Sequence, residues 1–141
     1  MKSKLGWILF SIALVAVIIL SSVLVSYEVK WKKGDELLNI YVDDVQSAYL
    51  YHYITSTEQP QKQEYELNAE QIQYIITEFY KSIFERDNSH YDEGSSGVVF
   101  KLKDGREVSF VVIGGKIIIN DKQYKCHSYL TNYIVTYGFG E

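Results

Sequence analysis

The chain has 141 residues, of which 47% are hydrophobic and 15% aromatic, and its formal net charge is −4. This length suits one domain of ordinary size rather than two. One proline and nine glycines exclude a collagen-like or low-complexity chain. A single cysteine excludes an internal disulfide framework and a cysteine-based zinc site.

The charge is distributed unevenly along the chain. Residues 1–33 contain five lysines and one acidic residue, whereas residues 34–141 contain nine Lys or Arg and 17 Asp or Glu, which gives this second part a net charge of −8. An acidic surface repels a phosphate backbone, so we expect no nucleic-acid partner. The acidic part is long enough to bury a core and to fold as one domain.

An uncharged apolar run from Leu5 to Tyr27 predicts a membrane-spanning helix. The run has 23 residues, and about 20 are needed to cross the hydrocarbon. Trp7 lies near one end and Trp31 beyond the other, which is the placement of interfacial aromatic belts. We therefore expect residues 1–27 to be an uncleaved signal-anchor helix that contacts lipid. A cleaved signal peptide is the alternative, although its apolar region is usually only about 7–15 residues long.

The orientation of this helix rests on its short basic N-terminus, because the lysines on its two sides nearly balance. Such an N-terminus resembles that of signal-anchor proteins and favours an extracytoplasmic C-terminal part. The sequence has no N-x-[ST] sequon and no lipobox cysteine beside the apolar run, as expected of a bacterial envelope protein. The predicted location is the cell membrane, crossed once. The three expected parts are residues 1–27 (anchor), 28–36 (polar linker) and 37–141 (extracytoplasmic domain).

The first half of the domain predicts two strands and a long helix. Leu37–Val42 and Val45–Ile54 have the composition of strands, and Thr55–Glu66 that of a loop. Asn68–Arg86 predicts a helix, with Asn68 as N-cap and Gln71 completing a capping box. Its apolar residues recur at helical spacing: Ile72, Ile75, Ile76, Phe79, Tyr80, Ile83 and Phe84. A polar loop is expected over Asp87–Gly97.

The stretch Val98–Cys126 predicts a four-strand antiparallel meander. A three-residue loop at 103–105 sets Phe100 opposite Val108, and a turn at 114–115 sets Val112 opposite Ile117. The predicted inner face is Val98, Phe100, Val108, Phe110, Val112, Ile117, Ile119, Tyr124 and Cys126.

A final helix is expected from a cap at Ser128 to a stop at Gly138, with Tyr129, Leu130, Tyr133, Ile134 and Tyr137 on its packed side. The predicted fold is therefore α+β: a transmembrane helix, then an antiparallel sheet packed with two helices.

The sequence VVFKLKDGREVSFVVIGGKIIINDKQY resembles small, uncharacterised membrane-anchored envelope domains of low-GC Gram-positive bacteria. The resemblance covers residues 97–137 and consists of strands and turns, not of a catalytic motif. It implies an envelope location and assigns no functional residue.

Residues that could carry chemistry are few. Cys126 lies beside His127, but neighbours on a strand point to opposite faces, so we expect a structural cysteine. His52, His90 and His127 lack metal-ligand spacing and are expected at the surface. The acidic loop with Asp87, Asp92, Glu93 and Gly94 does not match a calcium-binding loop, and Asp43-Asp44 is more typical of a turn than of paired catalytic acids. We therefore predict no metal, no cofactor and no catalytic residue.

The second face of the predicted sheet is unusually apolar, whereas a sheet covered on one side only has polar residues on the other. A loop or the long helix could cover this face. The alternative is a contact surface for another protein, because tyrosine and apolar patches are enriched at interfaces. Its residues are Tyr49, Tyr51, Tyr53, Val99, Val111, Ile113 and Ile118.

These features predict a non-enzymatic protein-binding or regulatory module of the cell envelope whose partner is another envelope protein. Two alternatives are an immunity or inhibitor protein, whose acidic domain would complement a basic toxin, and a hydrolase acting on envelope polymers. The hydrolase would need Asp43, Asp44, His52 or His90 to converge in one cleft.

Overall fold

The computed structural model describes residues 2–54, 61–89 and 96–138 of the chain. It divides into two units, Met1–Trp31 and Lys32–Glu141. The first contains one long apolar helix, and the second contains helices and most of an eight-stranded antiparallel sheet. The predicted α+β class with an N-terminal apolar helix is confirmed, and the sheet has more strands than the four of the predicted meander.

Helix α1 (Lys2–Lys30) is long and apolar enough to span a membrane. Its segment Lys4–Tyr27 has a mean hydropathy of 3.0 and none of it is buried within the chain. At 1.5 Å per residue, these 24 residues rise about 36 Å, which exceeds the hydrocarbon thickness. A signal sequence near the N-terminus meets the same criteria of length and hydropathy.

The domain has the strand order β1-β4-β8-β7-β6-β5-β2-β3. The strands are β1 (Trp31–Lys33), β2 (Val45–Ile54), β3 (Gln61–Glu66), β4 (Ile83–Arg86), β5 (Ser96–Leu102), β6 (Glu107–Ile113), β7 (Lys116–Ile119) and β8 (Lys122–Cys126). The helices are α2 (Gly34–Leu38), the 3₁₀ turn η1 (Val42–Asp44), α3 (Ala69–Lys81) and α4 (Leu130–Gly138). The segment predicted as a linker, residues 28–36, thus contains the end of α1, all of β1 and the start of α2.

The meander β5-β6-β7-β8 has the predicted register. Phe100 pairs with Val108, and Val112 pairs with Ile117. Gly105 has φ +88° and Gly115 φ +81°, backbone conformations that glycine adopts readily and other residues do not. These two turns fix which side chains face the core.

Helix α3 begins as predicted but ends earlier. The Asn68 side chain accepts a hydrogen bond from the Gln71 N–H at 2.9 Å, and Gln71 accepts one from the Asn68 N–H at 2.8 Å. The prediction of a helix up to Arg86 is wrong, because the backbone becomes extended at Ser82 and Ile83–Arg86 forms β4 against β8. Phe84 still joins the core from this strand, 4.7 Å from the Phe79 ring, whereas Ile83 is exposed.

Two further predictions around the first strands are wrong. Leu37–Val42 is not a strand: α2 ends at Leu38, and Asn39 turns the chain with φ 43°. The Ile40 N–H then donates to the Tyr80 hydroxyl at 3.0 Å, which fastens this turn to α3. In the predicted loop Thr55–Glu66, Gln61–Glu66 is strand β3, and residues 55–60 lie outside the described residues. Val45–Ile54 is a strand as predicted.

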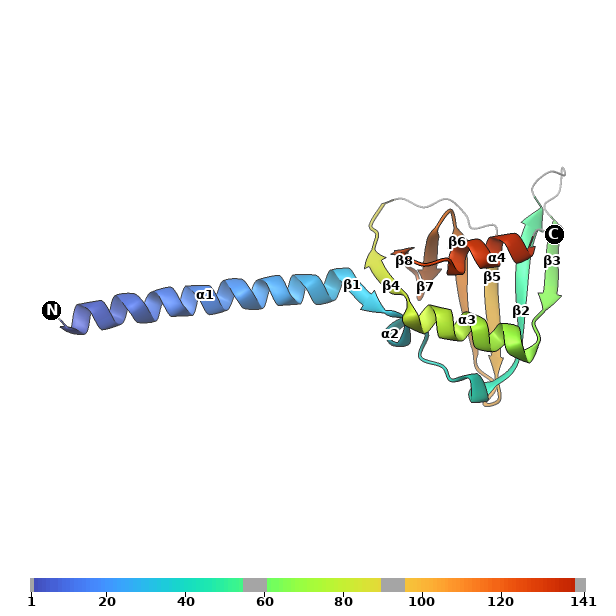
Figure 1. The fold of residues 1–141 in the computed structure, drawn as a ribbon, viewed down its shortest axis with the longest axis horizontal. Coiled ribbons are helices and arrows are strands. Elements are labelled where there is room, and N and C mark those ends of the chain that lie inside the picture. The colour runs from blue at the N-terminus through green and yellow to red at the C-terminus, as the bar shows by residue number, and fades with distance from the viewer. Residues whose placement is uncertain (1, 55–60, 90–95, 139–141) are drawn as a thin grey trace. The chain divides into compact units, whose positions relative to one another are not determined.

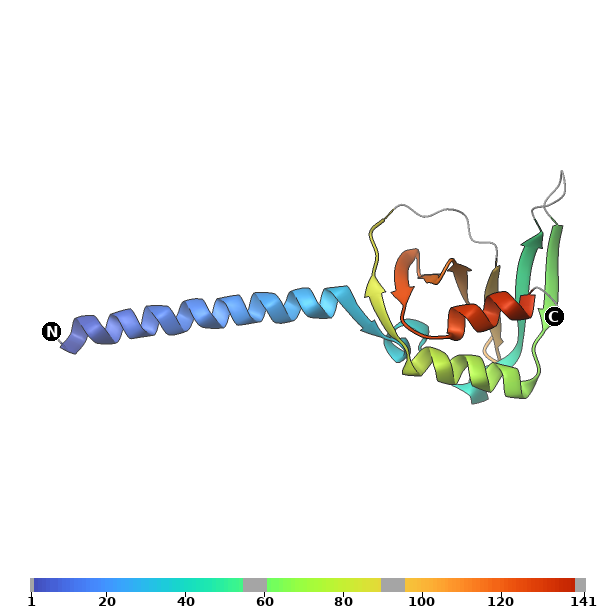
Figure 2. The same ribbon diagram turned by 45° about the horizontal axis from the view of Figure 1, so that its top comes forward.

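Helices α3 and α4 lie on the same side of the sheet (Figures 1 and 2). Phe79 of α3 packs 5.0 Å from the Phe110 ring of β6, and Leu130 and Ile134 of α4 are fully buried. Ser128 caps α4 by accepting the Leu130 N–H at 3.2 Å. Tyr129 was predicted on the packed side but is 82% exposed, and the side chain of Tyr137 lies outside the described part.

Candidate functional site

The face of the sheet opposite α3 and α4, which we call the open face, contains all seven predicted contact residues. Tyr49 pairs with Val99 across β2 and β5, and Val111 pairs with Ile118 across β6 and β7. Val99 is 8% exposed, and Tyr53, at the end of the row, is 37% exposed. The other five residues are half-buried. Helices α3 and α4 therefore cover one face of the sheet, and the open face presents an apolar and aromatic surface.

Three tyrosines of β2 and two lysines form one end of the open face. The Lys62 ammonium lies 4.9 Å from the centre of the Tyr51 ring and 5.6 Å from that of Tyr49. Lys101 lies 5.5 Å from the Tyr49 ring, and the rings of Tyr51 and Tyr53 meet edge to face at 5.8 Å. We call these five residues the tyrosine–lysine stripe. Its cation–π contacts stabilise this arrangement of rings and ammonium groups.

Glycine at position 97 makes room for this stripe. Gly97 pairs with Tyr51, and a Cβ atom there would lie 2.5 Å from the Tyr51 hydroxyl oxygen and 2.8 Å from the Phe110 carbonyl oxygen. Only a residue without a side chain allows Tyr51 to lie across β5 in this way.

The charge states within the stripe follow from its packing. Burial raises the pKa of Tyr51 above its usual value, and the neighbouring Tyr53 raises it further. The hydrogen bond from Lys62 to Glu64, at 2.7 Å, raises the pKa of Lys62. At neutral pH Tyr51 is therefore neutral and Lys62 is charged.

A shallow depression of about 360 Å³ lies at Tyr49, between β3 and β5. Its lining has acidic residues on one side and a lysine on the other: Ser47, Ala48, Tyr49, Glu64, Glu66 and Lys101. This volume is at the lower end of that of small-molecule pockets. A shallow surface with one tyrosine and charged groups of both signs suits contact with another protein surface.

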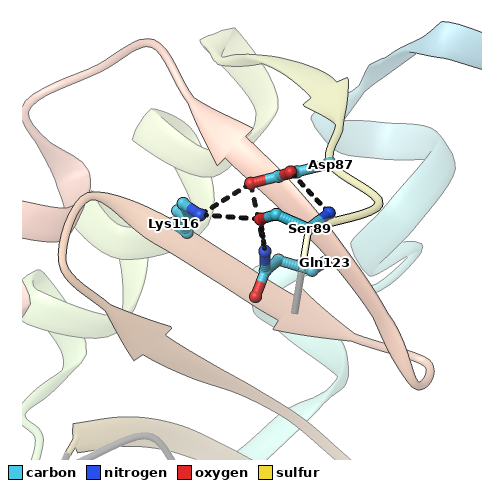
Figure 3. Close-up of polar contacts among 4 residues, drawn as sticks. All are labelled: Asp87, Ser89, Lys116 and Gln123. Carbon is cyan, nitrogen blue, oxygen red and sulfur yellow. Dashed lines mark hydrogen bonds and ion pairs between the residues drawn. The ribbon is translucent and has the colours of Figure 1, made fainter. Parts of the chain in front are cut away.

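A polar cluster occupies the other end of the open face (Figure 3). The Lys116 ammonium lies 2.8 Å from a carboxylate oxygen of Asp87 and donates to the Ser89 hydroxyl at 3.1 Å. The Gln123 amide donates to Asp87 at 3.0 Å and to Ser89 at 3.2 Å. These hydrogen bonds, that from Lys116 above all, hold the pKa of Asp87 well below its usual range.

The polar cluster was not predicted from the sequence. Asp87 was expected in a plain polar loop, whereas its N–H donates to the Gln123 carbonyl at 3.0 Å and so continues the pairing of β4 with β8. The predicted register does place Lys116 and Gln123 on the same face as Ile118. Their contact with Asp87 depends on β4, which the sequence had assigned to a helix. Asp92, Glu93 and Gly94 lie outside the described residues.

Of the residues considered for hydrolysis, the three that the structure describes do not meet. His52 was expected at the surface, but it is 5% exposed, and its Nδ1 lies 2.7 Å from the Ser96 hydroxyl, on the helix-covered face. Asp43 and Asp44 precede β2, whereas His52 lies near its end, so about 25 Å of strand separates them. His90 lies outside the described residues.

Cys126 and His127 point in different directions. The Cys126 sulfur lies 3.2 Å from the Ser128 hydroxyl, and burial raises the pKa of the thiol. His127 Nε2 lies 3.5 Å from a carboxylate oxygen of Glu85. A raised pKa keeps the thiol protonated, which disfavours a nucleophilic role. In residues 2–54, 61–89 and 96–138, no group of three or more His, Cys, Asp and Glu is placed to hold a metal ion.

No protein-family model matches the chain, and no similar protein was found among curated proteins or among solved structures. The candidate site therefore rests on the geometry of the open face.

Proposed function

We propose that this protein is a membrane-anchored, non-enzymatic binding or regulatory module of the cell envelope. Helix α1 anchors it, and the acidic domain lies outside the cytoplasm. The open face contacts another envelope protein. The observation that carries this proposal is the row of half-buried aromatic and aliphatic side chains on the face opposite α3 and α4.

The composition of the open face supports protein binding over small-molecule chemistry. Tyrosine rings supply contact area with little loss of conformational entropy. The apolar centre at Val99, Val111 and Ile118 is flanked by the tyrosine–lysine stripe and by the polar cluster. An apolar centre with a polar rim is the usual anatomy of a protein interface.

A photo-crosslinking residue at position 53 tests the binding proposal in cells that contain the full-length chain. We expect one discrete adduct, identified by mass spectrometry as a different membrane or envelope protein. The matched control is the same residue at position 129, an exposed tyrosine that directly precedes α4. Equal adducts at both positions, or none at position 53, would contradict the proposal. An adduct with a basic secreted protein would favour the inhibitor alternative.

Substitution at the centre of the open face should abolish that adduct without unfolding the domain. Val111→Asp places a charge in the apolar centre, and the expected result is at least a tenfold loss of adduct at position 53. Tyr129→Asp is the control and should leave the adduct unchanged. Loss of the adduct in both variants would show that acidic substitution acts by some route other than the open face.

The location is tested separately by protease protection. A C-terminal tag should be removed by external protease from intact cells, and the protein should sediment with membranes. Protection of the tag until lysis would reverse the proposed orientation. Recovery of soluble protein without residues 1–26 would identify a cleaved signal peptide and a secreted domain.

A further inference from the structure

Strand β3 (Gln61–Glu66) is the last strand in the order of the sheet, and β2 is its neighbour there. Five of its six residues are exposed. A terminal strand presents backbone N–H and C=O groups that can pair with another strand. The edge of the sheet is therefore a second place where this domain can bind a chain.

The hydrogen-bond alternation shows which residues present these groups. The Leu67 N–H donates to the Ala48 carbonyl at 2.9 Å, so this pair is of the hydrogen-bonded type. In an antiparallel ladder such pairs alternate with non-hydrogen-bonded pairs. The register Tyr51↔Glu64 and Tyr53↔Lys62 then places the backbone groups of Glu64 and Lys62 outward, at the edge.

The side chains along this edge complement a second copy of the same strand. If two β3 strands pair antiparallel around a two-fold axis at Gln63, Lys62 of each copy lies opposite Glu64 of the other copy. The two Gln63 residues then lie opposite each other. An axis at Glu64 sets Lys62 opposite Glu66 of the second copy, twice, but it also sets Glu64 opposite itself. An axis at Lys62 sets Lys62 opposite itself. Like charges directly opposite each other are destabilising, so the axis at Gln63 is favoured.

We propose that two copies of this chain pair through their β3 strands, antiparallel, with the two-fold axis at Gln63. The pairing is isologous, as in most symmetric dimers, and it puts the two tyrosine–lysine stripes on the same side of one continuous sheet. Lys62 and Glu64, which bond within one copy at 2.7 Å, also bond across the dimer. The proposal uses the edge of the sheet and does not depend on a partner for the open face.

The membrane anchor makes such a small interface sufficient. One strand pair buries less than the roughly 1,000 Å² typical of stable interfaces, so the dimer dissociates on dilution in solution. Helix α1 confines the copies to one plane, which raises their effective concentration. The alternative is that the charges of β3 only protect an exposed edge from pairing.

Disulfide trapping tests the register in full-length protein reconstituted in lipid vesicles. In a Cys126→Ser background, Gln63→Cys places two thiols opposite each other in a non-hydrogen-bonded pair, with Cα atoms about 4.5 Å apart. Mild oxidation should give a disulfide-linked dimer. Gln61→Cys is the matched control: its two copies lie four residues apart along the strands, about 13 Å, and should give at least tenfold less dimer.

A reciprocal charge swap separates pairing between copies from the ion pair within one copy. Lys62→Glu and Glu64→Lys, each combined with Gln63→Cys, set like charges opposite each other in their own dimers. The dimer yield of each should fall about tenfold. Mixing the two variants sets opposite charges face to face at both positions, so the mixed dimer should recover the original yield.

Three results would overturn the proposal: equal cross-linking at positions 61 and 63, absence of dimer at both positions, or dimer yields that do not change with the charge swap. The circular dichroism spectrum and melting temperature of each variant accompany the cross-linking. Positions 61 to 64 are exposed, so these variants should fold as the parent does.

Discussion

The two faces of one sheet are stabilised in different ways. On the covered face, Phe100 and Phe110 are at most 1% exposed, and the Phe110 ring lies 6.3 Å from that of Phe100 and 5.0 Å from that of Phe79 in α3. On the open face, apolar side chains are half-buried, and cation–π contacts and ion pairs lie beside them. Apolar burial is the main source of folding free energy. The covered face should therefore determine stability, and the open face recognition.

The largest expected effect on stability comes from the core between α3 and the covered face of the sheet. Phe79→Ala removes a fully buried ring that contacts Phe84 at 4.7 Å and Phe110 at 5.0 Å. The free energy of unfolding should fall by about 3–5 kcal/mol, measured by chemical denaturation of the full chain in detergent micelles. Tyr129→Ala, at an exposed position, should change it by less than about 0.5 kcal/mol. Equal effects would contradict the assignment of the core.

Alanine substitutions of two adjacent isoleucines in β7 compare the stability contributions of the two faces directly. Ile117 is fully buried on the covered face, and Ile118 is half-buried on the open face. Ile117→Ala should cost about 2–5 kcal/mol of unfolding free energy. Ile118→Ala should cost about 1 kcal/mol, because its side chain is only partly removed from water. A cost at position 118 equal to that at 117 would mean that the open face is covered in the folded protein.

The covered face could be predicted from the sequence because its signals are local. The turns at Gly105 and Gly115 fixed the register of the meander, and the capping box at Asn68 fixed the start of α3. Each depends on a few adjacent residues. Once the register is known, the alternation of side chains along each strand predicts which residues of the meander face the core.

The errors arose where local patterns were ambiguous or where the pairing is distant. Phe84 matched both the helical spacing of α3 and a short buried strand, and only pairing with β8, about 40 residues later, distinguishes them. The polar residues of β3 resemble a loop because the strand lies at the edge of the sheet. Leu38 and Ile40 are buried from a short helix and a turn whose positions depend on α3. The polar cluster needs β4, so it could not be predicted.

A substitution at Gly97, which Tyr51 approaches closely on the open face, should have an intermediate effect on the free energy of unfolding. In Gly97→Ala the new methyl group would lie 2.8 Å from the Phe110 carbonyl oxygen and 2.5 Å from the Tyr51 hydroxyl oxygen. The ring can move away, but the backbone carbonyl cannot move without shifting β6. The expected cost is about 1–3 kcal/mol of unfolding free energy. Tyr51→Ala in the same background should recover only part of it, and full recovery would show that the ring alone causes the strain.

The polar cluster should make the open face sensitive to acid. The Asp87 carboxylate accepts hydrogen bonds from Lys116, Ser89 and Gln123, and its pKa is held well below the 3.8 of an ordinary aspartate, chiefly by Lys116. A carboxylate whose pKa is lower in the folded state stabilises the fold above its unfolded pKa. That contribution is lost as the pH falls below about 4, toward the folded pKa.

The comparison of wild type with Asp87→Asn across pH isolates this contribution. At pH 6–7 the wild type should melt at a higher temperature than the variant, and the difference should shrink steadily below about pH 4 as the Asp87 carboxylate is protonated. In a Lys116→Gln background the same difference should be smaller at pH 6–7, because Lys116 is the largest cause of the lowered pKa. Melting temperatures followed by circular dichroism measure all four proteins. A difference that stays constant from pH 7 to pH 3 would mean that the carboxylate charge of Asp87 does not stabilise this end of the open face.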